Sequence, residues 1–199
     1  MNPIDFYFDF SSPYGYLASE LIDDLAAKHG RQVQWHPYLM GAALKRTGRA
    51  PLVNYDLVSG YATHDISRSA RLYGLRVSIP SKFPVASIAA CRAFYAINNT
   101  SETDAKKFAS AIYRAYFVDD RDIQTKQVVL EITEDCGHDT NKMAAALDDP
   151  GIKEKLRQVT DDAIEAGVFG SPFIIVDGEP FWGSDRLSQI DQWLETGGW

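Results

Sequence analysis

The chain has 199 residues, of which 45% are hydrophobic and 24% are charged, and its formal net charge is −7. This length predicts one domain, or a small domain with a large insertion, that can bury a sizeable core without disulfides. The acidic balance argues against a nucleic-acid binder, which needs a broad basic face, but it leaves room for a local pocket that binds a small anion.

The two cysteines, Cys91 and Cys136, form no C-x-x-C motif and are expected to be buried thiols. The first residues contain no basic region followed by an apolar run, so no signal peptide is expected. No stretch approaches the length of a membrane span. These features predict a cytoplasmic protein with neither membrane nor nucleic acid among its partners.

The first elements read as strand, helix and strand. Alternating apolar residues predict a strand over 4–10. Ser12 is a good N-cap and Pro13 fits the first helical position, so a helix follows and ends at Gly30. Residues 33–39 predict a second strand. This βαβ order implies that the two strands are parallel.

The middle of the chain contains no convincing alternating segment and is expected to be helical. Five amphipathic segments predict helices, at 68–73, 86–97, 104–117, 125–136 and 143–147. We therefore expect an all-helical insertion domain over residues 41–150.

The end of the chain returns to mixed α/β character. We predict a helix over 152–166, strands over 173–176 and 179–182, and a last helix that Asp185 can cap. Between the two strands, Asp177-Gly178 is a strong two-residue hairpin signal. The outline β-α-β, helical insertion, α-β-β-α is that of an α/β thioredoxin-like fold, with residues 1–40 and 151–199 forming the thioredoxin-like domain.

The start of the first helix is the first candidate site, because thioredoxin folds place their reactive centre there. Free backbone N–H groups at a helix start stabilise a thiolate. This chain has Ser11-Ser12-Pro13-Tyr14 in that place. A serine is not a redox group, but its hydroxyl can donate a hydrogen bond to an external thiolate and lower the pKa of that thiol. The alternative is that Ser12 serves only as the helix N-cap.

A second candidate is Pro172, which comes directly before a predicted buried strand. Thioredoxin-like proteins place a cis-proline here, opposite the first helix, and it turns the preceding backbone towards a bound peptide-like thiol. That reading predicts Ser171 as a backbone partner of the ligand's cysteinyl part. The alternative is an ordinary trans proline at a strand start, which is the commoner isomer.

A third candidate precedes the last helix, where Ser184 and Asp185 meet free N–H groups. A γ-glutamyl group would offer its amine to Asp185 and its carboxylate to Ser184. The alternative is that Asp185 only caps the helix.

Three motifs together carry a family resemblance: Phe8-Asp9-Phe10-x-Ser12-Pro13-Tyr14, Val168-Phe169-Gly170-x-Pro172 and Trp182-Gly183-x-Asp185-Arg186-Leu187. In this order the chain resembles the 2-hydroxychromene-2-carboxylate isomerases, glutathione-dependent relatives of the kappa-class glutathione transferases and of DsbA-like oxidoreductases. The resemblance implies that Ser12 holds glutathione as its thiolate, which adds to a conjugated alkene of the substrate. Rotation and elimination then give trans-o-hydroxybenzylidenepyruvate and free glutathione. It also implies a homodimer and a small aromatic carboxylate as substrate.

The chain departs from this family in two loops. Relatives carry an Asn in a Thr-Gly-Asn-x-Pro-Pro pattern, where this chain has Arg49, and an Asn in a Phe-Pro-x-Asn-Ser stretch, where it has Ala86. Arg49 either replaces the lost glutathione contact or points to solvent. Tyr14, Lys82 and Trp182 are the candidate residues of the substrate pocket, although a solvated surface position is the alternative for Lys82. The four histidines show no metal-ligand spacing, so no metal is expected.

Two other functions stay open beside the isomerase. A kappa-like transferase would use the same glutathione site and release a stable conjugate. A non-catalytic thioredoxin-like binding protein is compatible with the missing C-x-x-C motif. A disulfide oxidoreductase is not expected, because neither Cys91 nor Cys136 lies at the start of the first helix.

Overall fold

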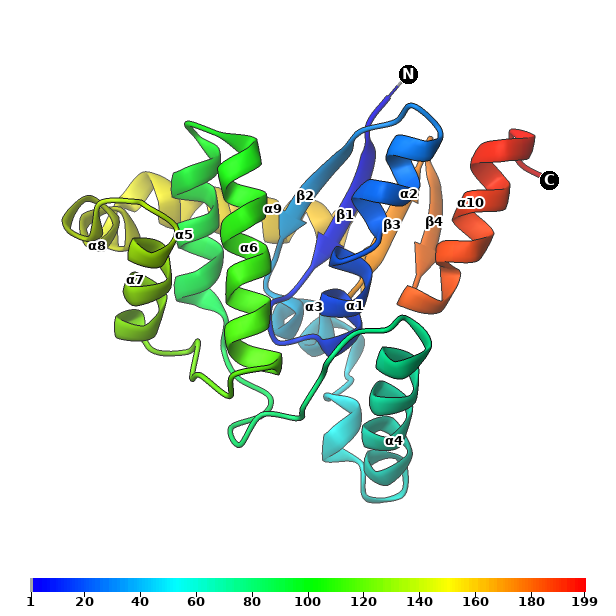
Figure 1. Cartoon of the computed structure of the whole chain (residues 1–199), viewed down its shortest axis with the longest axis horizontal. Helices are drawn as coiled ribbons and strands as arrows, with labels where there is room; N and C mark the ends of the chain where they lie inside the picture. The colour runs from blue at the N-terminus through cyan, green and yellow to red at the C-terminus, as the bar shows by residue number, and fades with distance from the viewer. Residues whose placement is uncertain (1) are drawn as a thin grey trace.

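A four-stranded mixed sheet forms the centre of the protein, which a computed structural model describes over residues 2–199 (Figure 1). The strands are β1 (Ile4–Phe8), β2 (Val33–Pro37), β3 (Phe173–Val176) and β4 (Glu179–Trp182). Their order is β2-β1-β3-β4. β1 pairs with β2 in parallel, as predicted, whereas β1–β3 and β3–β4 are antiparallel. The sheet therefore joins the two ends of the chain.

The helices follow this sheet in chain order: α1 (Pro13–Ser19), α2 (Ile22–Lys28), α3 (Met40–Thr47), α4 (Asp56–Leu72), α5 (Ile88–Asn98), α6 (Glu102–Phe117), α7 (Lys126–Asp135), α8 (Thr140–Asp148), α9 (Pro150–Glu165) and α10 (Leu187–Thr196). The described residues also form two short 3-10 turns, η1 (Leu52–Asn54) before α4 and η2 (Ser184–Arg186) before α10. Figure 1 shows α5 to α8 gathered at one side of the sheet, while α4 projects below it. No helix within residues 2–199 is both long and apolar enough to cross a bilayer.

The structure confirms the thioredoxin-like fold with its helical middle, and it corrects three details. The helix expected over 68–73 is α4, which begins already at Asp56. The single helix expected after Pro13 is two helices, because the α-helical ladder ends after Glu20. The Glu20 N–H still donates to the Tyr16 carbonyl at 3.3 Å, whereas the Leu21 N–H donates to the Ala18 carbonyl, only three residues back, at 3.1 Å. Helix α3 was not predicted, although its left-handed Gly48 and the basic last turn before it are ordinary C-terminal signals.

The core continues from the sheet into the helices without a break. Phe8 on β1 is fully buried and lies at its centre. Its ring is 4.9 Å from the ring of Phe6, 5.5 Å from that of Trp35 and 5.7 Å from that of Tyr113. Because Tyr113 belongs to α6, this aromatic group fixes the helical segment against the strand that leads to the candidate site.

We expect Phe8→Ala to lower the free energy of unfolding by roughly 3–5 kcal/mol, because it removes a ring that neighbours from several elements surround. The matched control is Leu57→Ala on α4, whose residue is 95% exposed, with an expected change within about 0.5 kcal/mol. Chemical denaturation of both variants measures this difference. Equal changes in the free energy of unfolding for the two variants would show that the aromatic side chains around Phe8 do not stabilise the fold.

Candidate active site

Ser12 lies where β1 passes into α1 and is only 4% exposed. Its hydroxyl oxygen accepts a hydrogen bond from the Gly15 backbone N–H at 3.1 Å, which confirms the predicted N-cap. The same hydroxyl donates its single proton to the Ser171 carbonyl at 2.8 Å. Because α1 has only seven residues, these local contacts define the polarity of the position more than a helix dipole does.

The turn before β3 meets the start of α1 directly. The Ser171–Pro172 peptide bond is cis, as predicted. Ser171 is 8% exposed, its carbonyl faces the Ser12 hydroxyl, and its own hydroxyl oxygen accepts from the Asp9 backbone N–H at 2.9 Å. The structure thus brings together two segments that lie at opposite ends of the sequence.

Gly15 is required where α1 approaches this turn. A Cβ at this position would lie 2.6 Å from the Tyr113 hydroxyl and 2.9 Å from the Ser171 hydroxyl oxygen. Both atoms belong to buried residues that cannot move away easily. The missing side chain therefore allows the close approach of α1 to the Ser171 turn.

A second loop, residues 81–85, lies beside Ser11. The Val85 backbone N–H donates to the Ser11 hydroxyl oxygen at 3.0 Å. Within this loop the Phe83–Pro84 peptide bond is also cis, which the sequence analysis did not predict. The loop contributes one wall next to the start of α1.

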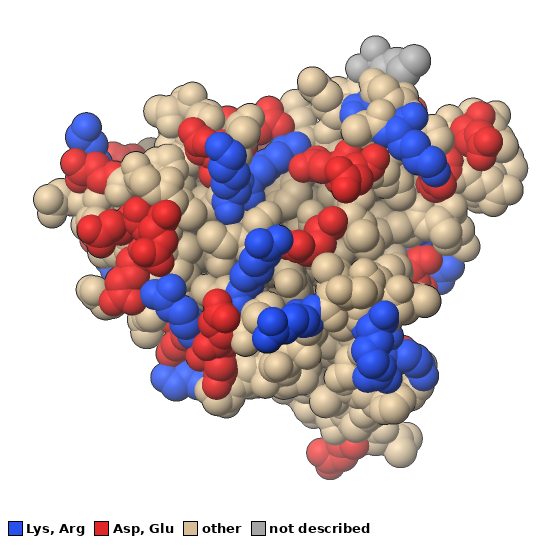
Figure 2. All heavy atoms as spheres, in the orientation of Figure 1, with Lys and Arg blue, Asp and Glu red and all other residues tan. Residues whose placement is uncertain are grey.

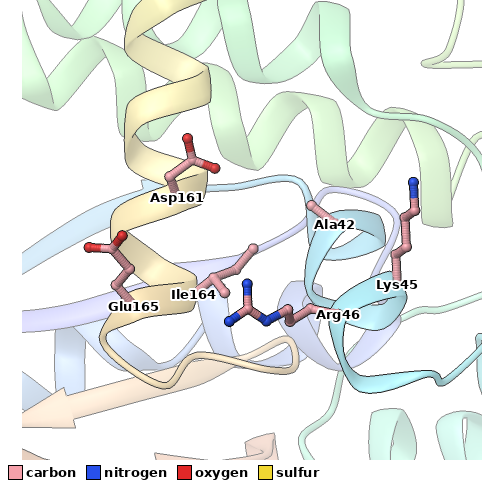
Figure 3. Close-up of a pocket in the computed structure, with 6 residues that line it drawn as sticks. All are labelled: Ala42, Lys45, Arg46, Asp161, Ile164 and Glu165. Atoms are coloured by element: carbon pink, nitrogen blue, oxygen red, sulfur yellow. The ribbon is translucent and has the colours of Figure 1, made fainter.

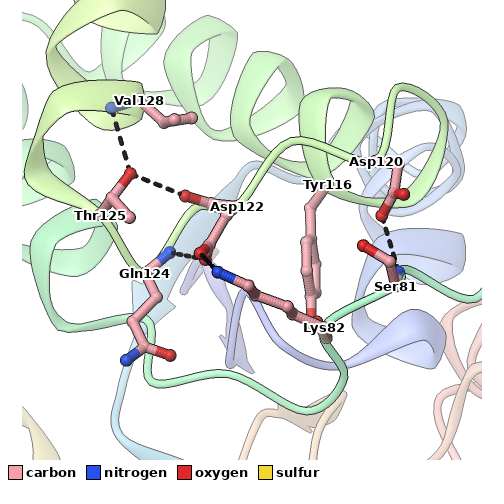
Figure 4. Close-up of polar contacts among 8 residues, drawn as sticks. All are labelled: Ser81, Lys82, Tyr116, Asp120, Asp122, Gln124, Thr125 and Val128. Atoms are coloured by element: carbon pink, nitrogen blue, oxygen red, sulfur yellow. Dashed lines mark hydrogen bonds and ion pairs between the residues drawn. The ribbon is translucent and has the colours of Figure 1, made fainter.

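The connection between α6 and α7 holds this loop in place (Figure 4). The Ser81 backbone N–H donates to Asp120 at 2.7 Å, and the Tyr116 hydroxyl donates to the Lys82 carbonyl at 2.8 Å. The Lys82 ammonium is 2.8 Å from the Asp122 carboxylate, and its side chain is 69% exposed. A contact between Lys82 and a substrate carboxylate would require the lysine to leave this ion pair.

Tyr14 follows Pro13 and is half-buried, with its hydroxyl committed to α4. The hydroxyl donates to Asp65 at 2.6 Å, and Asp65 also forms an ion pair with Arg68. Burial raises the pKa of Tyr14, and the hydrogen bond to Asp65 raises it further. Tyr14 therefore stays neutral. The 3-10 turn η2 (Ser184–Arg186), which carries Asp185, contacts α1.

Asp185 lies in η2 and does not cap α10, which corrects the predicted cap. The N-cap position of α10 is Arg186, with no side-chain hydrogen bond. The Asp185 carboxylate instead folds back over Gly183, where a Cβ would lie 2.3 Å from its oxygen and φ is +112°. The Asp185 side chain is 70% exposed, and its one ion pair, with Arg186, is long at 3.5 Å. This carboxylate is thus free to receive a cationic group of a ligand.

Ser184 and Trp182 flank Asp185 in different ways. Ser184 is 3% exposed, and its carbonyl accepts from the Tyr73 hydroxyl at 3.1 Å. Trp182 is 51% exposed, and a Cβ on Gly170 would lie 2.3 Å from its indole nitrogen. Trp182 therefore offers an aromatic surface beside the turn that carries Ser171.

Arg49 follows Gly48, the left-handed residue that ends α3. Its backbone N–H donates to the Leu44 carbonyl at 2.9 Å, and its side chain is exposed. Within residues 2–199 the Arg49 guanidinium forms no hydrogen bond or ion pair. Its predicted role in binding glutathione stays a prediction.

Two surface cavities lie away from these residues. One of about 550 Å³ separates α3 from α9, with Arg46 extending towards Ile164 (Figure 3). Another of about 360 Å³ lies between α4 and the segment 75–78. Figure 2 shows basic and acidic groups interleaved over one face. The described residues contain no cluster of three His, Cys, Asp or Glu side chains arranged for a metal.

The sequence analysis missed Asp9 as part of this site. Its place among the alternating polar residues of the first strand predicts a solvent-facing side chain, yet Asp9 is 6% exposed. Burial raises the pKa of its carboxyl, and hydrogen bonds from Ser11, Met40 and Ser87 lower it in part. The available signals were the position of Asp9 shortly before the Ser11-Ser12-Pro13 turn and its place in the Phe8-Asp9-Phe10-x-Ser12-Pro13-Tyr14 motif. Asp65, on α4, had none.

The family of DSBA-like thioredoxin domains matches residues 3–195. The chain is 30% identical to a 2-hydroxychromene-2-carboxylate isomerase of Sphingobium xenophagum over 193 residues, which cover 96% of this chain and 97% of that protein. It is 26% identical to glutathione S-transferase kappa 2 of Caenorhabditis elegans over 204 residues, 96% of this chain and 91% of that protein.

A solved structure of a 2-hydroxychromene-2-carboxylate isomerase superposes on this chain with a TM-score of 0.87 at 26% identity, covering 98% of this chain and 95% of the other. Both the structural match and the sequence matches thus extend over nearly the whole chain. The protein therefore belongs to the DSBA-like thioredoxin domain family and, within it, to the 2-hydroxychromene-2-carboxylate isomerases.

Proposed function

We propose that this protein is a glutathione-dependent cis-trans isomerase that acts on 2-hydroxychromene-2-carboxylate or a similar small aromatic carboxylate. The observation that carries the proposal is the contact between the Ser12 hydroxyl and the Ser171 carbonyl, 2.8 Å apart at the start of α1. It places a hydroxyl donor beside the backbone of a cis-proline turn, where a peptide-like thiol can be held. The isomerase and kappa-class relatives support the same reading.

The residues present fit glutathione at both ends of such a site. Ser12 offers a hydroxyl, Ser171 offers a backbone carbonyl, and Asp185 offers an exposed carboxylate on η2, which contacts α1. The carboxylate suits the amine of a γ-glutamyl group, and the carbonyl suits a peptide N–H. When bound, glutathione supplies a thiol nucleophile that adds reversibly to a conjugated alkene, permits rotation about the resulting single bond and leaves unchanged.

Ser12 has one proton to donate, so its two possible partners exclude each other. The hydroxyl turns from the Ser171 carbonyl to a thiolate only when another donor serves that carbonyl. A peptide N–H of the ligand is such a donor. The Gly15 N–H continues to donate to the Ser12 oxygen and polarises its O–H towards the thiolate. Ser12 can thus donate to a thiolate while it remains the N-cap of α1, and no buried polar group is left unpaired.

The aromatic side chains of Tyr14 and Trp182 would orient the substrate and would not transfer protons to it. Tyr14 keeps its proton and donates a hydrogen bond to Asp65, and Trp182 presents its indole beside Gly170. Flat aromatic surfaces of this kind stack against an aromatic substrate. Lys82 is the candidate cation for the substrate carboxylate, once it is released from Asp122.

A kappa-like transferase is the second candidate, favoured by the 26% identity to a kappa-class enzyme over nearly the whole chain. The two candidates share the glutathione site and differ in product. Mass spectrometry of the reaction separates them, because an isomerase leaves the substrate mass unchanged and a transferase adds one glutathione.

We expect Ser12→Ala to lower glutathione-dependent turnover about 10²- to 10³-fold, as loss of a donor to a developing anion does in other enzymes. Absorbance of a chromene carboxylate, followed with and without glutathione, measures this. The matched control is Ser11→Ala, which removes the neighbouring hydroxyl that accepts from Val85, and its loss should be far smaller. Ser12→Ala also removes the N-cap and should cost about 0.5–2 kcal/mol of stability. Turnover that needs no glutathione would contradict the proposal.

We expect Asp185→Asn to raise the KM for glutathione about tenfold, because the neutral amide no longer pairs with an ammonium group, while kcat at saturation changes little. Glutathione titration at fixed substrate measures both constants. Asp177→Asn is the control, since Asp177 pairs with Arg31 at the other end of β3. A KM that stays unchanged in Asp185→Asn would remove this residue from the glutathione site.

A further inference from the structure

The buried carboxylate of Asp9, three residues before Ser12, has no role in the proposed function above. One of its oxygens accepts from the Ser11 backbone N–H at 2.8 Å and from the Ser87 hydroxyl at 2.8 Å. The other accepts from the Met40 backbone N–H at 2.9 Å. The carboxylate therefore joins the turn before α1, the start of α3 and the start of α5.

The main chain of Asp9 makes a second set of contacts to the same site. Its N–H donates to the Ser171 hydroxyl oxygen at 2.9 Å. Its carbonyl accepts from the Ser12 N–H at 2.9 Å and from the Tyr113 hydroxyl at 3.1 Å. Asp9 thus contacts both Ser12 and Ser171 through its main chain. Its carboxylate holds the Ser11 N–H in the turn before α1.

No cation pairs with this carboxylate in the described part of the chain. Its negative charge is instead held by two backbone donors and one hydroxyl. A buried carboxylate next to a thiolate is electrostatically unfavourable, because two like charges repel each other in a poorly solvated region. We therefore look for a stabilising role that outweighs this repulsion. The contacts of Asp9 indicate that it holds the turn before α1 and the Ser171 turn in a fixed arrangement.

We propose that Asp9 is a positioning residue, which holds the Ser11-Ser12 turn and the Ser171 turn in the arrangement that lets Ser12 serve a bound thiolate. This inference rests on the proposed glutathione site and adds to it a residue that does not itself touch the ligand. Asparagine cannot replace Asp9, because both carboxylate oxygens accept from backbone N–H groups. An amide has one acceptor oxygen, so its NH2 group would face either Ser11 or Met40 donor to donor.

Two explanations of Asp9 predict opposite changes in Asp9→Asn. If Asp9 acts mainly as a charge, its removal relieves repulsion and lowers the pKa of a bound glutathione thiol. If Asp9 acts by positioning, its removal misplaces the Ser12 donor and raises that pKa. The other ionisable side chains on which the charge of Asp9 acts are Tyr38, Cys91, Tyr113 and Tyr116. Burial raises the pKa of each, so all four stay neutral during such a titration.

The experiment follows thiolate absorbance of glutathione bound to the full-length protein as pH is raised. We expect Asp9→Asn to raise the bound thiol pKa by about one unit relative to the unmodified protein. The matched control is Ser87→Ala, which removes one donor but keeps the charge and both backbone contacts, and its shift should be clearly smaller. A lowered or unchanged pKa in Asp9→Asn would overturn the proposal.

A readout without ligand separates this proposal from the proposed function. Hydrogen exchange of the Ser11 and Met40 amides in the ligand-free protein should be faster in Asp9→Asn and unchanged in Ser87→Ala. If the unmodified protein shows no bound thiolate, the glutathione site is wrong, while exchange still tests the positioning. Equal protection in Asp9→Asn would overturn it.

A milder variant keeps the proposal testable if Asp9→Asn does not fold. Ser171→Ala leaves the carboxylate intact and removes only the acceptor of the Asp9 N–H. It should raise the bound thiol pKa and speed exchange of the Asp9 amide. An unchanged pKa and unchanged exchange in Ser171→Ala would count against positioning by Asp9.

Discussion

The hydrogen bond from the Ser12 hydroxyl to the Ser171 carbonyl is the contact around which the rest of the site is arranged. It joins the first helix to the turn before β3 and so connects the two ends of the chain across the sheet. Both residues are buried, so neither polar group has water as a substitute partner. A ligand that accepts the hydrogen bond of the Ser12 hydroxyl leaves the Ser171 carbonyl without this donor, and a peptide N–H of the proposed ligand would replace it.

The helical middle of the chain supports this contact from outside. The segment between α6 and α7 holds the loop 81–85, whose Val85 N–H reaches Ser11. Helix α4 holds Tyr14 through Asp65, and α6 carries Tyr113 to the backbone of Asp9. Through these contacts the helical segment holds the residues around the start of α1 in place.

Loss of the redox pair changes what the fold can do at the same place. A thioredoxin-like protein with cysteines exchanges disulfides there, but a serine cannot be oxidised and can only donate or accept hydrogen bonds. In the proposed function the thiol comes from a bound ligand. The exposed Asp185 carboxylate, on the η2 turn that contacts α1, is a group that can pair with the amine of such a ligand.

Local signals in the sequence determined the strands, the parallel βαβ start, the Ser12 cap and the Asp177-Gly178 hairpin, because each depends on neighbours within a few residues or on the order of elements. They left the isomer of Pro172 open, and the structure shows that it is cis. They did not predict the break between α1 and α2, nor that Asp185 lies in η2 and does not cap α10. Only the tertiary structure showed that Asp9 is buried and that Lys82 is paired with Asp122. Asp9 follows β1, which ends at Phe8, and the starts of α3 and α5, which come from distant segments, provide two of its three donors.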